Sequence, residues 1–161
     1  MPRISVTYFL IAAILLMCLL IAFTSKQMNK NIEDPGQNII KSVKAVLTDN
    51  NLKEIKLNEA VDGKNAGKFS VLITLTNNSP AKLVMLKQSK PIFAELFSND
   101  KVYEAYIIWR TSDSSNIQWM RIGYDLAAVA DVNWNTVDEA TLPDSATQYI
   151  QDRMLSSIED K

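Results

Sequence analysis

The sequence predicts an α+β protein, in which an N-terminal transmembrane helix precedes a two-layer domain of two helix-plus-β-hairpin units, with an antiparallel sheet, helices on one face, and C-terminal helices. Three observations predict this fold. Residues 4–23 form an uncharged apolar run. Residues 39–76 contain a stretch with helical apolar spacing and then two stretches in which apolar and polar residues alternate. The same order of segments recurs in residues 89–125.

The apolar run is long enough to cross a bilayer. At about 1.5 Å per residue, a helix over residues 4–23 measures roughly 30 Å, the thickness of the hydrocarbon core. We therefore interpret residues 1–24 as a single-pass signal anchor. A cleaved signal peptide is the alternative, but its apolar core is shorter, about 7–15 residues, and ends in small residues. Acylation of Cys18 is disfavoured, because the large residues 15–17 precede it.

The charges beside the run do not set its orientation. Arg3 lies on one side, and Lys26 and Lys30 lie on the other. A short leader followed by an apolar helix is typical of bacterial signal anchors, so we expect an extracytoplasmic domain at the cell membrane. Residues 25–36 are polar and predict a spacer, and residues 37–161 predict the domain itself.

The first helix-plus-hairpin unit begins with an amphipathic helix over residues 39–47. Strands over 52–59 and 68–76 follow, joined by a turn-rich loop that lacks the ligand spacing of a calcium loop.

In the second unit, Ser89 is a candidate helix cap with Pro91 in the first turn. The helix ends near residue 98, and strands over 102–110 and 116–125 follow. At an ungapped offset of 50, eight positions between residues 43 and 54 align on the second unit with their chemistry preserved, and the alternative is chance patterning of two helix-plus-hairpin units. Examples are Val43, Leu47 and Leu52, which align with Phe93, Phe97 and Val102. One extra residue in the second loop keeps the apolar face of the returning strand in phase. These features indicate an internal repeat.

Alternation assigns the two faces of the second hairpin. The side expected to meet the helices consists of Tyr103, Ala105, Ile107, Trp109, Met120, Ile122 and Tyr124. The opposite side gathers aromatic and charged residues beside Ile108 and Gly123, and its candidate binding surface is Glu104, Tyr106, Trp119 and Arg121. Tyr106 is expected to face Arg121, with Glu104 diagonal to that arginine. The alternative is that the C-terminal segment covers this side.

The C-terminal segment predicts further helices. Residues 126–131 are a short helical stretch, and Trp134 is expected to pack into the core. Ser145 and Gln148 form a capping-box pattern before a last helix, whose apolar stripe is Ile150, Met154, Leu155 and Ile158.

Composition excludes several chemistries. The 161 residues include no histidine, and the only cysteine is Cys18. This composition excludes serine or cysteine nucleophiles that histidine activates, and it excludes zinc sites built from histidine and cysteine ligands. We therefore expect no metal, no cofactor and no enzyme activity. The net charge of −1 gives no basic patch for nucleic acid.

The stretch Val102-Tyr-Glu-Ala-Tyr-Ile-Ile-Trp109, with Trp134, the Leu142-Pro143 pair, Ala146 and Tyr149, resembles uncharacterised small exported or membrane-anchored proteins of Gram-positive bacteria. The resemblance covers residues 85–150 and implies location and domain type only. The order of helix and hairpin is also similar to that of the peptidase-inhibitory PepSY modules. Their closing Asp-x-x-x-Gly-x-[Ile/Val] strand is missing here.

We therefore expect a membrane-anchored extracytoplasmic interaction or regulatory domain without catalytic activity. Its partners would be the membrane, through residues 4–23, and an envelope protein or peptide. One alternative is an accessory subunit of a membrane complex, with the apolar helix carrying the contact. Another is an envelope enzyme that uses carboxylates such as Asp113, Asp125 or Asp131.

Overall fold

The computed structural model of the chain describes residues 17, 34–47, 51–78 and 81–152. The chain divides into two units, Met1–Asp34 and Pro35–Lys161. Met17 and Asp34 are the described residues of the first unit, so the predicted anchor otherwise lies outside the described residues. Within the described ranges, no helix has the length and apolar character needed to cross a bilayer.

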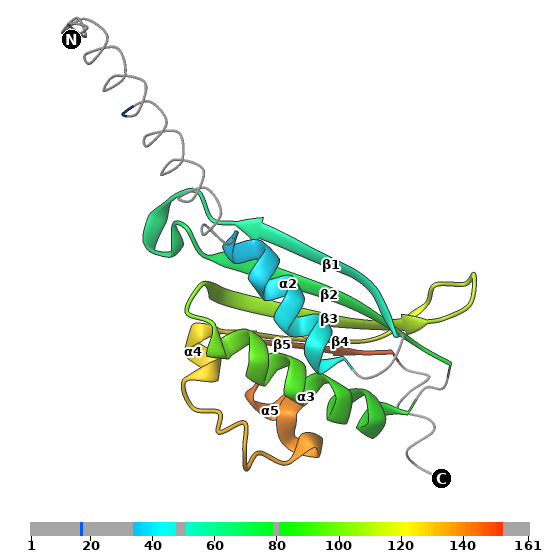
Figure 1. Cartoon of the computed structure of the whole chain (residues 1–161). Helices are drawn as coiled ribbons and strands as arrows, with labels where there is room; N and C mark the ends of the chain where they lie inside the picture. The colour runs from blue at the N-terminus through cyan, green and yellow to red at the C-terminus, as the bar shows by residue number, and fades with distance from the viewer. Residues whose placement is uncertain (1–16, 18–33, 48–50, 79–80, 153–161) are drawn as a thin grey trace, which may run out of the picture. The chain divides into compact units, whose positions relative to one another are not determined.

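The second unit is an α+β domain built on a five-stranded mixed sheet (Figure 1). Its longer elements are α2 (Pro35–Val46), β1 (Leu52–Glu59), β2 (Phe69–Asn77), α3 (Lys82–Ser98), β3 (Val102–Thr111), β4 (Gln118–Asp125) and β5 (Gln148–Gln151). Its short helices are η1 (Gly63–Asn65), α4 (Leu126–Val129), η2 (Glu139–Thr141) and α5 (Leu142–Ser145).

The strands lie in the order β1-β2-β3-β4-β5. Strand β2 runs parallel to β3, and the other three neighbouring pairs are antiparallel. The prediction of an entirely antiparallel sheet is therefore wrong. The physical reason is the crossover: α3 carries the chain back along the sheet, so that β3 starts at the same end as β2.

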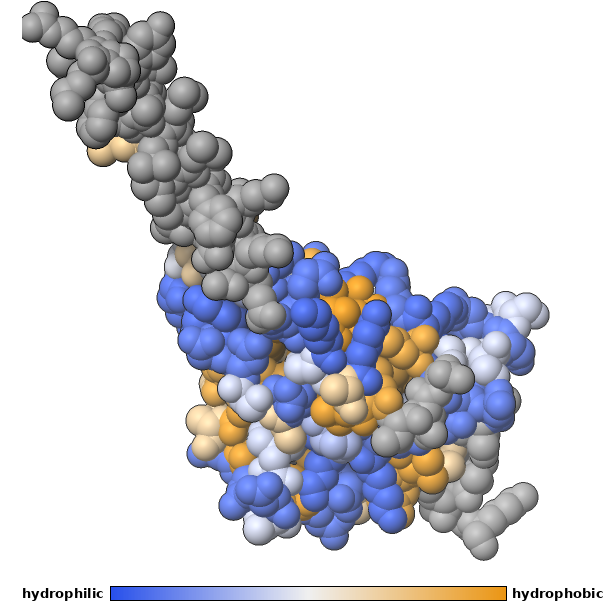
Figure 2. All heavy atoms as spheres, viewed as in Figure 1, coloured by the Kyte–Doolittle hydropathy of each residue, from blue (hydrophilic) through white to orange (hydrophobic). Residues whose placement is uncertain are grey.

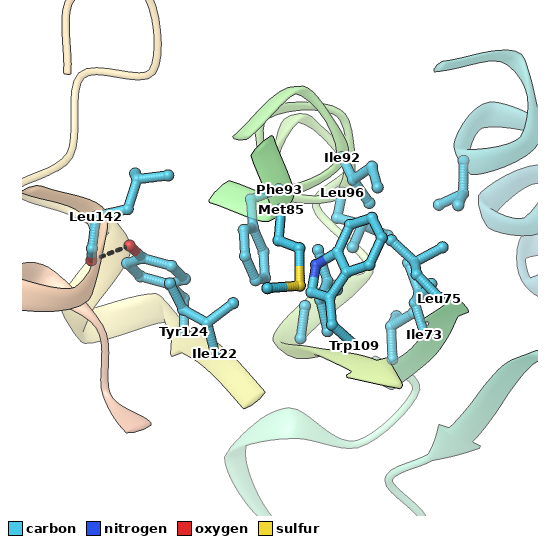
Figure 3. Packing of buried hydrophobic residues seen from close by; sticks show 14 of the residues in the cluster. Ile73, Leu75, Met85, Ile92, Phe93, Leu96, Trp109, Ile122, Tyr124 and Leu142 are labelled. Atoms are coloured by element: carbon cyan, nitrogen blue, oxygen red, sulfur yellow. Dashed lines mark hydrogen bonds between the residues drawn. The ribbon is translucent and has the colours of Figure 1, made fainter. Parts of the chain in front are cut away.

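Both long helices lie on one face of the sheet, as predicted (Figure 1). The buried core between the helices and the sheet contains Ile39 and Val43 of α2, and Phe93 of α3. From the strands it includes Ile73 and Trp109, which are fully buried (Figure 3). The strands thus bury one side of their pleat, and no helix of the described residues lies over the other side.

Helix α2 begins earlier than predicted. Pro35 and Gly36, assigned by the sequence to the spacer, form its first turn, and Gly36 is buried. Proline suits the first turn of a helix, because its missing N–H would have no helical partner there.

Helix α3 also begins earlier than predicted. It starts at Lys82, so Ser89 is an interior residue and Pro91 lies inside the helix. Interior proline costs a helix about 3 kcal/mol. The burial of Met85 and Leu86 contributes roughly 1.5–3 kcal/mol each and offsets that cost.

The two hairpins are not superimposable, although their first strands begin at the aligned residues Leu52 and Val102. The two hairpins can be compared from the helix side, with β1 and β3 pointing the same way. Because β2 and β3 run parallel, β2 then lies to one side of β1, whereas β4 lies to the other side of β3. The sequence repeat is therefore a repeat of pattern and element order, with opposite hairpin handedness.

The segment after β4 packs beside α3 and returns as a fifth strand. Tyr124 donates a hydrogen bond from its hydroxyl to the carbonyl of Leu142 at 2.5 Å (Figure 3). Trp134 packs against the core, 6.0 Å from Phe93 and 5.3 Å from Tyr124 between ring centroids, as predicted.

The predicted last helix is wrong over residues 148–151, which form β5 against β4. Tyr149 packs against the core, while Ile150 points to the other side and is 47% exposed. Side chains that alternate between the two sides of the sheet are typical of a strand, and residues 148–151 follow this pattern. Met154, Leu155 and Ile158 of the predicted helix lie outside the described residues.

A buried hydrogen-bonded pair joins α3 to the centre of the sheet. The Trp109 indole donates to the hydroxyl of Ser89 at 2.9 Å, and that hydroxyl donates to the Met85 carbonyl at 2.7 Å. Both Trp109 and Ser89 are fully buried. Ser89 thus satisfies an indole N–H that has no water around it.

Ser89→Ala is expected to lower the free energy of unfolding by about 1–3 kcal/mol, because it leaves the Trp109 indole without an acceptor. Ser98→Ala is the matched control, since Ser98 makes a similar bond to the Glu95 carbonyl on the exposed end of the same helix. That control is expected to change the free energy by less than about 0.5 kcal/mol. Urea unfolding measures both, and equal effects would contradict this role of Ser89.

Candidate binding surface on the open sheet face

The sheet face turned away from α2 and α3, called here the open face, presents side chains in rows across the strands. One row, in register from β1 to β5, is Glu54, Thr74, Ile108, Arg121 and Ile150. The next row is Lys56, Leu72, Tyr106, Gly123 and Gln148. The face combines apolar, aromatic and charged groups.

Tyr106 and Arg121 stack at the centre of this face. Tyr106 lies directly opposite Gly123, and its ring occupies the space of the missing side chain: a Cβ on Gly123 would come within 2.1 Å of Tyr106 Cδ1. The Arg121 guanidinium lies 4.7 Å from the centre of the Tyr106 ring. The two side chains therefore meet as a cation–π pair, but the predicted facing position is wrong, because Arg121 lies opposite Ile108 and diagonal to Tyr106.

Glu104 completes the group from the same strand. Tyr106 donates a hydrogen bond from its hydroxyl to Glu104 Oε2 at 3.3 Å. The predicted diagonal position beside Arg121 is wrong, because Glu104 lies opposite Asp125. Burial and the nearby Glu104 carboxylate raise the pKa of Tyr106, and the Arg121 charge partly opposes them. The Tyr106 hydroxyl therefore stays protonated at neutral pH.

Arg121 has an unsatisfied polar atom. Its Nε is buried and has no hydrogen-bond partner in the described part of the chain. Buried polar groups without partners are uncommon in folded proteins, and each calls for an explanation.

Trp119 does not belong to the open face. A bulge in β4 places Trp119 and Met120 together opposite Trp109, so the alternation shifts by one residue. Trp119 is 8% exposed and belongs to the same buried cluster as Trp109 and Met120. The prediction that Trp119 forms part of the candidate surface is therefore wrong.

Another bulge changes the placement of Tyr103. It is the extra residue where the register of β2 with β3 shifts, and it interacts with Ser70 and Glu104. Burial and Glu104 raise the pKa of Tyr103. Contrary to the prediction, Tyr103 does not belong to the core cluster.

The carboxylates considered for catalysis are not brought together. Asp113 lies in the β3–β4 loop, where hydrogen bonds from Ser115 and Thr111 lower its pKa. Asp125, at the far end of β4, caps α4 by accepting bonds from the amides of Ala127 and Ala128. Asp131 lies elsewhere, where it lines a hollow of about 420 Å³ together with Asp144. Among the described residues, no group of three or more acidic, histidine or cysteine side chains could hold a metal ion.

A further hollow lies on the helix side. It has a volume of about 330 Å³, and its lining includes Val46 at the end of α2, the following Leu47, Pro91 of α3, and Trp109. Figure 2, which views this side, shows hydrophobic surface near the end of α2 with hydrophilic residues around it. The described lining of this hollow also includes Lys87 as its one charged residue, whereas the open face presents several charged groups.

In the comparisons with known proteins, no family model, curated protein or solved structure matches the chain.

Gly123→Ala is expected to destabilise the domain by about 1–3 kcal/mol, because the added methyl group displaces the Tyr106 ring. In a Tyr106→Ala background the same change should cost less than about 0.5 kcal/mol, since the space is then empty. Urea unfolding of the four proteins in this double-mutant cycle measures the coupling. An equal cost in both backgrounds would show that the ring does not depend on Gly123.

Proposed function

We propose that this protein is a membrane-anchored extracytoplasmic interaction or regulatory domain without catalytic activity, which binds an envelope protein or peptide through the open face. The stack of Tyr106 and Arg121 is the observation that supports this most strongly. Tyrosine and arginine are among the residues that contribute most binding energy at protein interfaces. After a small side-chain movement, the unpartnered Arg121 Nε–H could donate a hydrogen bond to an incoming carbonyl or carboxylate oxygen.

The face is favoured over the edges of the sheet. The outer edge of β1 carries Lys53, Glu54 and Lys56, and charged side chains of this kind protect edge strands from pairing with other chains. The opposite edge, β5, has 4 residues and offers few backbone groups. A partner is therefore expected to meet side chains of the sheet rather than extend it.

The proposed location is supported by the uncharged run over residues 4–23 and by the resemblance to membrane-anchored proteins of Gram-positive bacteria. An anchor of this kind keeps the domain at the membrane, where envelope proteins are its nearest neighbours. Binding through a shallow face then benefits from a high local concentration of the partner.

The test is capture of partners from the membranes of the source organism with the full-length tagged chain. The chain itself should stay in the membrane fraction after an alkaline wash. Tyr106→Ala/Arg121→Ala is expected to reduce at least one captured protein by about tenfold, because interface hot spots contribute about 1–2 kcal/mol or more each.

Lys41→Ala/Lys44→Ala is the matched control, because both lysines are exposed on α2, on the helix side. It should leave capture unchanged. Identical captured proteins from the wild-type chain and the Tyr106/Arg121 variant would contradict the proposal, as would loss of the chain from membranes on alkaline washing.

A further inference from the structure

A second feature of the open face is a hollow of about 250 Å³ between β1 and β3. Its sides carry the cationic groups of Lys53, Lys56 and Arg110, against one carboxylate, that of Glu54. Its floor includes Leu72 and Ile108. The sequence places Ile108 on the candidate side and assigns no role to the other residues of the hollow.

One residue of the β3–β4 loop holds two of the cations. Lys53 Nζ donates to the Asn116 side-chain oxygen at 2.8 Å, and Arg110 Nη1 donates to the Asn116 carbonyl at 2.9 Å. Asn116 has a φ of 50°, in the left-handed region that asparagine adopts more readily than most residues. A lysine and an arginine from different strands are thus fixed at one end of the hollow.

Their charges are not neutralised within the described residues. Lys56 forms an ion pair with Glu54 at 3.2 Å, whereas neither Lys53 nor Arg110 has a described carboxylate within ion-pair distance. An ammonium and a guanidinium each have several N–H donors, so both groups keep donors beyond their bonds to Asn116. This end of the hollow can therefore take a negative charge.

The floor is apolar, although no helix in the described part of the chain lies over it. Ile108 is 8% exposed, and Leu72 on the neighbouring strand is half-buried. A ligand that only supplied negative charge would leave this floor uncovered.

The opposite end of the face is acidic, since Glu104 and Asp125 lie directly across from each other. The charge on the face therefore changes sign along the strands.

We infer that the hollow binds an extended acidic segment of a partner protein. One carboxylate of that segment lies between Lys53 and Arg110, and a neighbouring apolar side chain covers Leu72 and Ile108. Acidic residues of the ligand then lie toward the β3–β4 loop and away from Glu104 and Asp125. This inference rests on the proposed use of the open face. It adds the chemical class of the partner segment and the direction in which its acidic residues lie along the strands.

The test uses the full-length protein in an uncharged detergent and fluorescence anisotropy of a labelled peptide of alternating Glu and Val. Lys53→Glu/Arg110→Glu is expected to weaken binding by at least about tenfold, because it reverses both charges at the site. Asn116→Gly keeps the backbone free to adopt a positive φ but removes the side-chain acceptor of Lys53, so it should weaken binding about threefold.

The matched control is Lys41→Glu/Lys44→Glu, which changes the net charge equally on α2 and should leave binding unchanged. A Gln-Val peptide should bind at least about tenfold more weakly, since it lacks the carboxylates. A Glu-Ser peptide should bind severalfold more weakly, since it lacks the apolar side chains.

Equal losses in the Lys53/Arg110 variant and the Lys41/Lys44 variant would overturn the inference, because they would indicate attraction to overall charge. Equal binding of the Glu-Val and Glu-Ser peptides, with full competition by polyphosphate, would assign the hollow to polyanions instead. Binding seen only after deletion of residues 153–161 would assign it to the chain's own C-terminal segment.

These experiments can contradict one proposal without contradicting the other. If Tyr106→Ala/Arg121→Ala loses its membrane partners while Lys53→Glu/Arg110→Glu keeps them and binds the Glu-Val peptide normally, the acidic-segment inference is wrong and the proposed function stands. If the Tyr106/Arg121 variant keeps all partners, the proposed function is wrong.

Discussion

The parallel pairing of β2 with β3 is the constraint on which the arrangement of the domain depends. Two parallel neighbours need a crossover, and α3 supplies it over one face of the sheet. Helix α2 packs on the same side, where the two helices share one buried core with the strands. Since both long helices lie there, the opposite face has no described helix over it. The candidate site exists because of this one-sided cover.

A bare sheet face must limit the exposure of its apolar residues, and this one does so with its own long side chains. The Tyr106 ring lies over Gly123, and Arg121 lies over that ring. Lys53 reaches from β1 to Asn116 in the β3–β4 loop. These side chains lie along the sheet, and Ile108 is only 8% exposed although none of the described helices covers it. The groups that shield the face are the groups proposed to bind a partner.

Regular alternation made much of this fold predictable, and irregularities in the pleat account for most of the errors. The strands, and the placement of Tyr106 and Arg121 on one face, follow from a period of two. Trp119 could not be placed, because a bulge shifts the alternation by one residue without any signal in the residue pattern. Pro91 suggested a helix start, but burial of the preceding turns outweighs its cost. Gln148–Gln151 is too short for periodicity to separate strand from helix.

The most direct test of the central claim, that the open face is the binding face, is site-specific photocrosslinking in intact membranes. A photoreactive phenylalanine analogue replaces either Leu72, on the open face, or Lys41, exposed on α2. Our account predicts a discrete protein adduct from position 72 and none from position 41. Adducts from position 41 alone, or equally from both positions, would contradict it.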